Sequence, residues 1–220
     1  MGASCWDGLD EAGLRFGDYV RDAIGWAGVL RAERRVSRVA LLGHSEGALV
    51  ITFAAGRAQA DRVVLLGGAG APAGPMIERQ FAAGGLPEPL RVELRRVLAQ
   101  LAAGEPATDV PAPLASIFRP SVQPYLMSWL PIDPALALSR VAVPVLIVQG
   151  STDIQVGVAD ARVLAAARPG AGLAVIDGMN HILRSAPIDR AANVATYRDP
   201  ALPLHPGLLP VLVAFLRRAT

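Results

Sequence analysis

The sequence predicts an α/β fold with a mostly parallel sheet. Short apolar runs recur along the 220-residue chain, most of them end at glycine, and helical patterns separate them. Hydrophobic residues make up 52% of the chain and charged residues 18%, so a sizeable core can be buried. Strands that alternate with helices in this way form parallel sheets joined by right-handed crossovers.

The first predicted elements are a helix and two strands. Within residues 10–35, apolar side chains recur at three- and four-residue steps, which predicts an amphipathic helix. The apolar run 37–42 stops at Gly43 and predicts a buried strand. Residues 47–60 are small and apolar, as in a helix packed on a sheet, and a second strand is predicted over residues 61–66.

Residues 71–140 differ in character from both flanks. Twelve of the 18 prolines lie between positions 72 and 144, mixed with helical patches such as residues 90–101. We therefore expect an inserted helical lid over 71–140, with the α/β core made of 1–70 and 141–220. The elements predicted after the insertion are strands 144–148 and 173–176 and helices 158–167 and 207–218.

Composition and charge exclude several classes of protein. The net charge is only +2 and the basic residues, all arginine, form no long cluster, so we expect no nucleic-acid partner. No apolar run reaches the roughly 18 to 20 residues that span a membrane. The single cysteine, Cys5, excludes an intrachain disulfide and multi-cysteine metal sites. The first ten residues lack signal-peptide features, so a cytoplasmic location is expected.

Residues 43–47 (GHSEG) match the G-x-S-x-G pattern. This pattern presents a serine at the tip of a tight strand-to-helix turn, and the flanking glycines let neighbouring backbone pass closely. The N–H groups of the following helix then favour developing negative charge. Ser45 is thus a candidate nucleophile, and the alternative is a glycine-rich turn that has no catalytic role.

A serine nucleophile needs a base, and the chain has three histidines. His44 lies inside the turn and His205 sits between prolines, whereas His181 follows the fourth predicted strand. Functional residues collect at the carboxyl ends of parallel strands, which favours His181. Asp153 gives the chain order Ser, Asp, His, so we prefer it as the orienting carboxylate. A capping role for Asp153 and the choice of Asp177 are the alternatives.

The order GHSEG, VLIVQGSTDIQV, IDGMNHIL and a terminal helix resembles the α/β-hydrolase-fold serine hydrolases, close to the bacterial esterase and serine-aminopeptidase-like branch. The resemblance covers nearly the whole chain. It implies that Ser45 is the nucleophile, His181 the general base and acid, and Asp153 its orienter. It also implies that the backbone N–H of Glu46 is an oxyanion donor, that the substrate is a small acyl compound, and that no metal or cofactor takes part.

The chain departs from this family at its start. Only about 40 residues precede Ser45, whereas the family normally places several strands there, one of which ends in a loop that gives a second oxyanion donor. Residues 1–4 resemble the tail of the family's D-x-R-G-x-G-x-S segment. We therefore expect an N-terminally shortened fold. Strand 37–42 would then be an open edge that favours pairing with a second copy of the chain.

Aromatic residues give further expectations. Phe118, Tyr125 and Trp129 supply apolar area in the predicted lid and are candidate substrate-binding residues, with packing of the lid as the alternative. Trp26 and two other aromatic residues, Trp6 and Phe16, are expected in the core. Cys5 is expected to be inert, because the sequence pairs it with no base.

The leading functional hypothesis is a serine hydrolase that cleaves a carboxylic ester through an acyl-enzyme on Ser45. Peptidases, thioesterases and perhydrolases of the same fold use the same triad and remain near alternatives. The alternative of a different class is an N-terminally truncated, non-catalytic fragment that serves as an association module.

Overall fold

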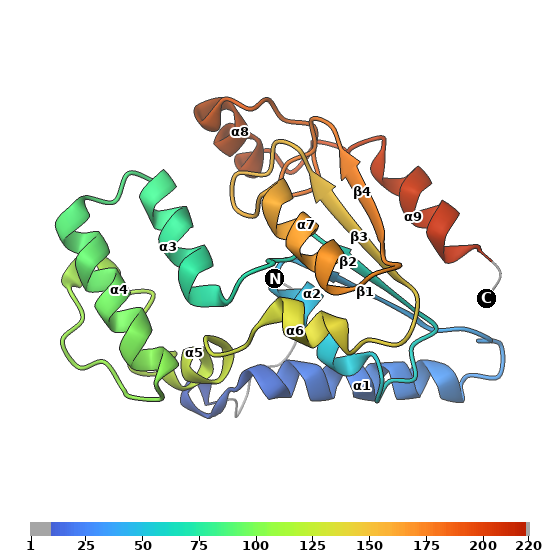
Figure 1. Cartoon of the computed structure of the whole chain (residues 1–220), viewed down its shortest axis with the longest axis horizontal. Coiled ribbons are helices and arrows are strands. Elements are labelled where there is room, and N and C mark those ends of the chain that lie inside the picture. The colour runs from blue at the N-terminus through green and yellow to red at the C-terminus, as the bar shows by residue number, and fades with distance from the viewer. Residues whose placement is uncertain (1–9, 219–220) are drawn as a thin grey trace. The chain divides into compact units, whose positions relative to one another are not determined.

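A four-stranded parallel sheet organises the structure, a computed structural model that describes residues 10–218 (Figure 1). Its strands pair in the order β1-β2-β3-β4, and every neighbouring pair is parallel. They are β1 (Ala40–His44), β2 (Arg62–Leu66), β3 (Val145–Gly150) and β4 (Gly172–Ile176). Each strand overlaps a predicted strand, so the predicted α/β fold with a mostly parallel sheet is confirmed.

The chain divides into two compact units. The sheet unit comprises residues 20–72 and 133–218, and the helical unit comprises residues 10–19 and 73–132. The helical unit thus covers most of the predicted 71–140 insertion, and it also includes residues near the start of the chain. The role of this unit as a lid stays a prediction. The last eight residues of the predicted insertion, which include the helix α6 (Pro134–Ser139), belong to the sheet unit.

Helices flank the strands within the sheet unit. Two of them lie where expected, because α7 coincides with the predicted helix 158–167 and α9 lies inside 207–218. The first turn of α1 is counted with the helical unit. The helices are α1 (Phe16–Ala32), α2 (Glu46–Ala54), α6 (Pro134–Ser139), α7 (Val158–Ala167), α8 (Arg190–Ala195) and α9 (Leu208–Leu216).

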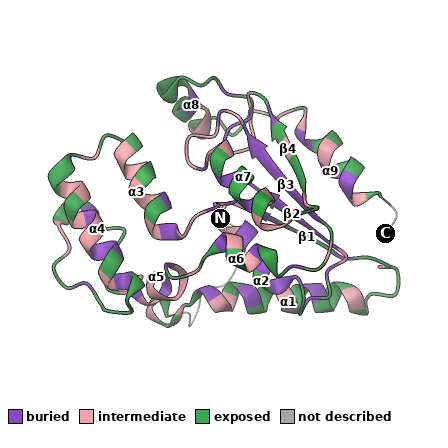
Figure 2. Cartoon of the chain, in the orientation of Figure 1, coloured by how far each residue is buried: buried purple, intermediate pink, exposed green. Residues whose placement is uncertain are grey.

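Both faces of the sheet are covered, and the alternation of side chains along β3 shows how. Val145 and Ile147 pack in one cluster with residues of α2, α6 and α7, including Leu164. Leu146 and Val148 point the other way and pack with residues of α9. Figure 2 shows β2 and β3 as buried along their length. Strands buried on both faces read as continuous apolar runs, which is why the sequence predicted them.

The helical unit contains α3 (Ala73–Ala83), α4 (Glu88–Ala102) and α5 (Gln123–Trp129). Pro87 immediately precedes α4, and Pro89 lies at its second position. Proline is tolerated there because the N–H groups of the first turn form no hydrogen bond within the helix. The buried residues of α4 recur at three- and four-residue steps, which places them on one face. They are Leu94, Val97, Leu98 and Leu101.

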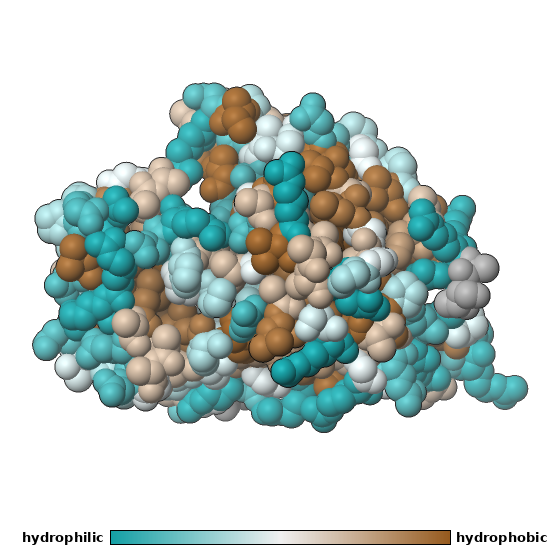
Figure 3. All heavy atoms as spheres, viewed as in Figure 1, coloured by the Kyte–Doolittle hydropathy of each residue, from teal (hydrophilic) through white to brown (hydrophobic). Residues whose placement is uncertain are grey.

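Apolar side chains are exposed at both edges of the sheet formed by the described residues. Leu42 on β1 is 46% exposed, and Leu173 and Val175 on β4 are exposed as well. Figure 3 shows hydrophobic atoms at the surface beside β4. The expectation that the β1 edge pairs with a second copy stays a prediction.

Two expectations about the first helix have different outcomes. Phe16 is buried, as predicted, whereas the prediction that Trp26 belongs to the core is wrong, because its side chain is 71% exposed on α1. The expectations for residues 1–4, Cys5 and Trp6 lie outside the described residues. Among residues 10–218, the structure has no helix both long and apolar enough to cross a membrane.

Candidate active site

Ser45 occupies a strained turn between β1, which ends at His44, and α2, which begins at Glu46. Its φ of 56° and ψ of −121° are unusual for a residue with a side chain and match the strained strand-to-helix turn that the motif requires. The Ser45 N–H donates to the Leu66 carbonyl at 2.8 Å, which fixes the turn to β2. A Cβ at Gly43 would lie 2.1 Å from the Gly47 oxygen, so this position requires glycine.

A chain of two hydrogen bonds joins the three predicted site residues. Ser45 Oγ lies 3.0 Å from His181 Nε2, and His181 Nδ1 lies 2.8 Å from Asp153 Oδ2. An ionised carboxylate only accepts, so Nδ1 carries the proton and Nε2 is free to accept from the serine hydroxyl. The side chains of His181 and Asp153 are almost entirely buried. The structure thus brings the three residues together, and their catalytic roles stay predictions.

The alternative acid and the alternative bases have other partners. Asp177 is exposed, and it accepts a hydrogen bond from Ser151 Oγ at 2.8 Å. His205 accepts the Gly207 N–H at 3.1 Å, close to the start of α9. The geometry therefore favours Asp153 as the partner of His181.

His44 supports the loop that carries His181, a contact that sequence reasoning missed. Its Nε2 donates to the His181 carbonyl oxygen at 2.7 Å, and the two ring centroids are 4.8 Å apart. Burial, followed by the nearby His181, lowers the pKa of His44 and favours its neutral form. No signal in the sequence predicts this contact, because the two residues are 137 positions apart.

Glu46 is the first residue of α2 and follows the candidate nucleophile directly. Its backbone N–H has no acceptor within the helix, since the first four N–H groups of any helix lack one. The N–H is therefore available to an oxygen that develops negative charge beside Ser45. Burial raises the pKa of the Glu46 carboxyl.

Comparison with known proteins identifies the family. Residues 3–196 match the alpha/beta hydrolase family. The chain belongs to this family. The esterase EstD of Thermotoga maritima is 26% identical over 178 residues, which cover 76% of this chain and 40% of the esterase. The chain therefore spans less than half the length of this curated relative.

Solved structures share the fold of this alpha/beta hydrolase. A bromoperoxidase from Bacillus anthracis superposes with a TM-score of 0.55 at 15% identity, over 99% of this chain and 78% of that one. A hydrolase from Oleispira antarctica gives a TM-score of 0.54 at 15% identity with the same coverage of both chains. At this identity the likeness shows the fold alone.

Buried amide side chains join the loops that carry Asp153 and His181 in this alpha/beta hydrolase. Asn193, on α8, donates to the carbonyl oxygens of Thr152 and Pro187 at 2.8 and 2.9 Å. The amide of Asn180, the residue before His181, lies 3.3 Å from Asn193 Oδ1. Asn193 therefore links the loop of Asp153 to that of His181. Sequence reasoning missed this link, because asparagine in a loop usually indicates only a turn.

Gly67, just after β2, leaves room for the hydrogen-bonded side chains of Asp153 and His181. It has a φ of +55°, and a Cβ there would lie 3.4 Å from both Asp153 Oδ2 and His181 Nδ1. Glycine meets both the backbone requirement and the space requirement at this point.

The aromatic candidates lie in the helical unit of this alpha/beta hydrolase. Phe118 is 0% exposed and packs in its interior. Tyr125 is buried, and its ring contacts those of Tyr19 and Trp129 at centroid distances of 5.8 and 6.2 Å. The substrate-binding role of Phe118, Tyr125 and Trp129 stays a prediction.

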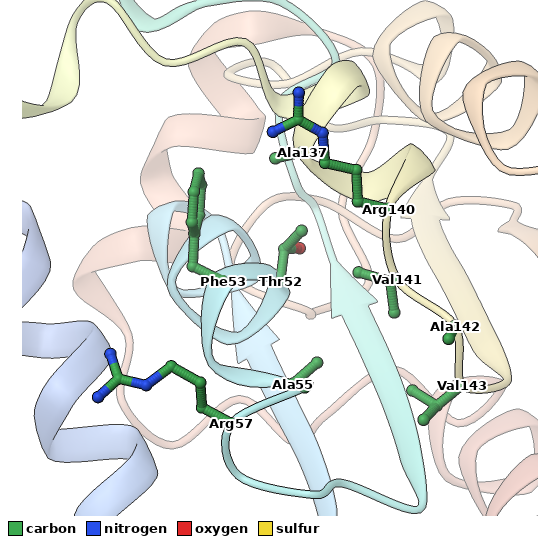
Figure 4. A pocket seen from close by; sticks show the side chains of 10 residues that line it. Thr52, Phe53, Ala55, Arg57, Ala137, Arg140, Val141, Ala142 and Val143 are labelled. Atoms are coloured by element: carbon green, nitrogen blue, oxygen red, sulfur yellow. The ribbon is translucent and has the colours of Figure 1, made fainter.

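A hollow of about 430 Å³ in the sheet unit is lined by α2 and residues 137–143 (Figure 4). Arg57 and Arg140 lie at its two ends with their guanidinium groups far apart, and its walls are largely apolar. Its lining includes none of the three predicted catalytic residues.

Proposed function

We propose that the chain is a serine hydrolase that cleaves a carboxylic ester through an acyl-enzyme on Ser45. The observation that carries the proposal is the continuous hydrogen-bond chain from Ser45 Oγ through His181 to Asp153. Membership of the alpha/beta hydrolase family and the similarity to an esterase support the same reaction class.

In the proposed mechanism, Ser45 Oγ attacks the ester carbonyl while His181 Nε2 takes its proton. Asp153 holds the imidazole in the required tautomer and stabilises the imidazolium that forms. The Glu46 N–H donates to the oxyanion of the tetrahedral intermediate. His181 then returns the proton to the leaving alcohol. Water next attacks the acyl-enzyme while His181 Nε2 takes its proton, and His181 gives that proton to Ser45 Oγ as the carboxylic acid leaves.

A fluorophosphonate probe tests this proposal directly, since it reacts with an activated serine. We expect the purified chain to be labelled at Ser45, as read by mass spectrometry of the peptide, and the Ser45→Ala variant to stay unlabelled. Circular dichroism of both proteins shows whether the variant keeps its fold. Labelling of Ser45→Ala to the same extent would overturn the assignment of the nucleophile.

A substrate panel separates the near alternatives. It pairs p-nitrophenyl esters of increasing chain length with an acyl thioester, an aminoacyl amide, and acetate plus hydrogen peroxide. We expect the esters to give the highest kcat/KM. Dominant thioester, amide or peracid chemistry would place the chain with the thioesterases, peptidases or perhydrolases respectively.

The open β1 edge favours the alternative of a different class, a non-catalytic association module. That alternative requires a folded parent chain that neither reacts with the probe nor turns over any ester.

A further inference from the structure

Gln149 is a buried polar residue near the carboxyl end of the otherwise apolar strand β3. It is 0% exposed, and by alternation its side chain lies on the same face as Val145 and Ile147. A buried polar side chain in such a strand needs hydrogen-bond partners and a reason for its presence. The predicted strand ended at residue 148, and sequence reasoning assigned Gln149 no role.

The Gln149 amide nitrogen donates toward the candidate acid. Nε2 lies 3.0 Å from Asp153 Oδ2, 2.8 Å from the Val156 carbonyl oxygen and 3.3 Å from that of Gly150. All three partners only accept. Exchanging the amide oxygen and nitrogen would therefore place an acceptor against three acceptors, so the chemistry fixes the orientation.

This orientation leaves the amide oxygen without a partner. Gln149 Oε1 is buried and accepts no hydrogen bond from any described residue. An unpaired buried acceptor costs stability. The strand therefore holds a polar side chain here although one of its two polar atoms is unpaired.

The Asp153 carboxylate accepts four hydrogen bonds, two on each oxygen. Oδ1 accepts the N–H groups of Gln155 and Val156 at 2.8 and 2.9 Å. Oδ2 accepts from Gln149 Nε2 and from His181 Nδ1. Gln149 thus shares one oxygen with the imidazole, and among the described residues these two are the side chains that donate to this carboxylate.

We propose that Gln149 is a positioning residue, whose amide holds Asp153 Oδ2 in line with His181 Nδ1 and withdraws negative charge from that oxygen. This inference rests on the proposed serine-hydrolase function. Loss of the amide would let the carboxylate rotate about its side chain, and would leave more of its charge to stabilise the imidazolium. His181 would then be held less well for accepting the serine proton, and would keep its own proton to higher pH.

The central test is Gln149→Met, which keeps the side-chain volume and removes both the amide donor and the unpaired acceptor. We expect kcat on a p-nitrophenyl ester to fall about 10- to 100-fold, the scale of a lost positioning contact in a metal or catalytic site, while KM changes little. The acid limb of the kcat/KM profile moves to higher pH. The Tm of the variant falls as well, because the buried Val156 carbonyl loses its donor, so the pH profile rather than the Tm separates the positioning role from a structural one.

Gln123→Met is the matched control. Gln123 is also buried, but its amide pairs with the backbone of Ala107 and Phe118 and leaves no atom unpaired. Its substitution therefore lowers Tm and leaves the pH profile in place. Other titratable groups that interact with the pair are unchanged in both variants: His44 at the end of β1 and Tyr197 after α8.

A second readout does not depend on turnover. A proton held between imidazole and carboxylate gives a separate downfield resonance in proton NMR, and its loss in Asp153→Asn assigns it to the His181–Asp153 bond. We expect Gln149→Met to shift or broaden it. An unchanged resonance, with kcat and pH profile also unchanged, would overturn the positioning role. Turnover that persists in Ser45→Ala would instead refute the proposed function, and the resonance would still decide the role of Gln149.

Discussion

The carboxyl ends of the strands and the edges of the same sheet are built in opposite ways. At the ends, polar side chains such as Asp153 and His181 are buried and hydrogen-bonded on several sides. At the edges, apolar side chains such as Leu42 and Leu173 face solvent. Buried polar side chains in this chain therefore depend on their hydrogen-bond partners. A buried polar group is stable where it is paired, whereas an apolar side chain on an edge strand stays exposed where no described element packs over it.

The largest expected effect is a loss of activity when the buried carboxylate of Asp153 is replaced. Asp153→Asn keeps the shape of the side chain, but an amide favours the wrong imidazole tautomer at His181, so kcat should fall by about 10⁴. Steady-state kinetics on an activated ester measures the loss.

Asp177→Asn is the control for Asp153→Asn, because Asp177 is exposed and its carboxylate accepts a hydrogen bond from Ser151 rather than from His181. We expect its kcat to change by less than about tenfold. The reverse ranking of the two variants would move the acid role to Asp177.

A smaller effect is expected on self-association, which tests whether the β1 edge of the sheet pairs with a second copy of the chain. Leu42→Lys places a charge on the open β1 strand, and charged edge residues oppose strand pairing between chains. We expect the parent to self-associate and Leu42→Lys to weaken that association by about tenfold or more, as measured by sedimentation velocity over a concentration series.

Leu136→Lys is the matched control for the edge, since Leu136 is 53% exposed but lies on α6. Its substitution should leave association unchanged. A parent chain that stays monomeric at all concentrations, or equal effects of both substitutions, would contradict pairing through β1.

The smallest effect concerns Glu46, whose carboxyl has a raised pKa because it is partly buried. Folding therefore favours its protonated form, and the stability from this group is lost as pH rises through the raised pKa. Glu46→Gln cannot ionise, so its Tm should exceed that of the parent by about 2 °C at pH 8 and by less at pH 4.

Thermal unfolding at both pH values measures this difference. Glu105→Gln, at an exposed position, is the control and should show no such pH-dependent gain. A gain for Glu46→Gln that is the same at both pH values would rule out ionisation of Glu46 as the cause.

Sequence patterns predicted the parts of the site that lie at strand ends. The GHSEG turn, Asp153 after β3 and His181 after β4 were each identified from their place beside an apolar run, and the structure brings all three together. Patterns failed for Trp26, because a helical face packs only where a neighbour lies against it. Periodicity predicts which face of a helix is apolar, but it does not predict which other element packs against that face.

By itself, the sequence determined the α/β fold, the places of the strands and the identity of the candidate nucleophile, base and acid. These properties depend on local backbone preferences and on the alternation of apolar runs with turns, which short stretches encode. Only the tertiary structure decided how Gln149, His44 and Asn193 support that site. Their hydrogen bonds join residues of separate segments and depend on the directions of single polar atoms, and residue types and spacings carry no record of such directions.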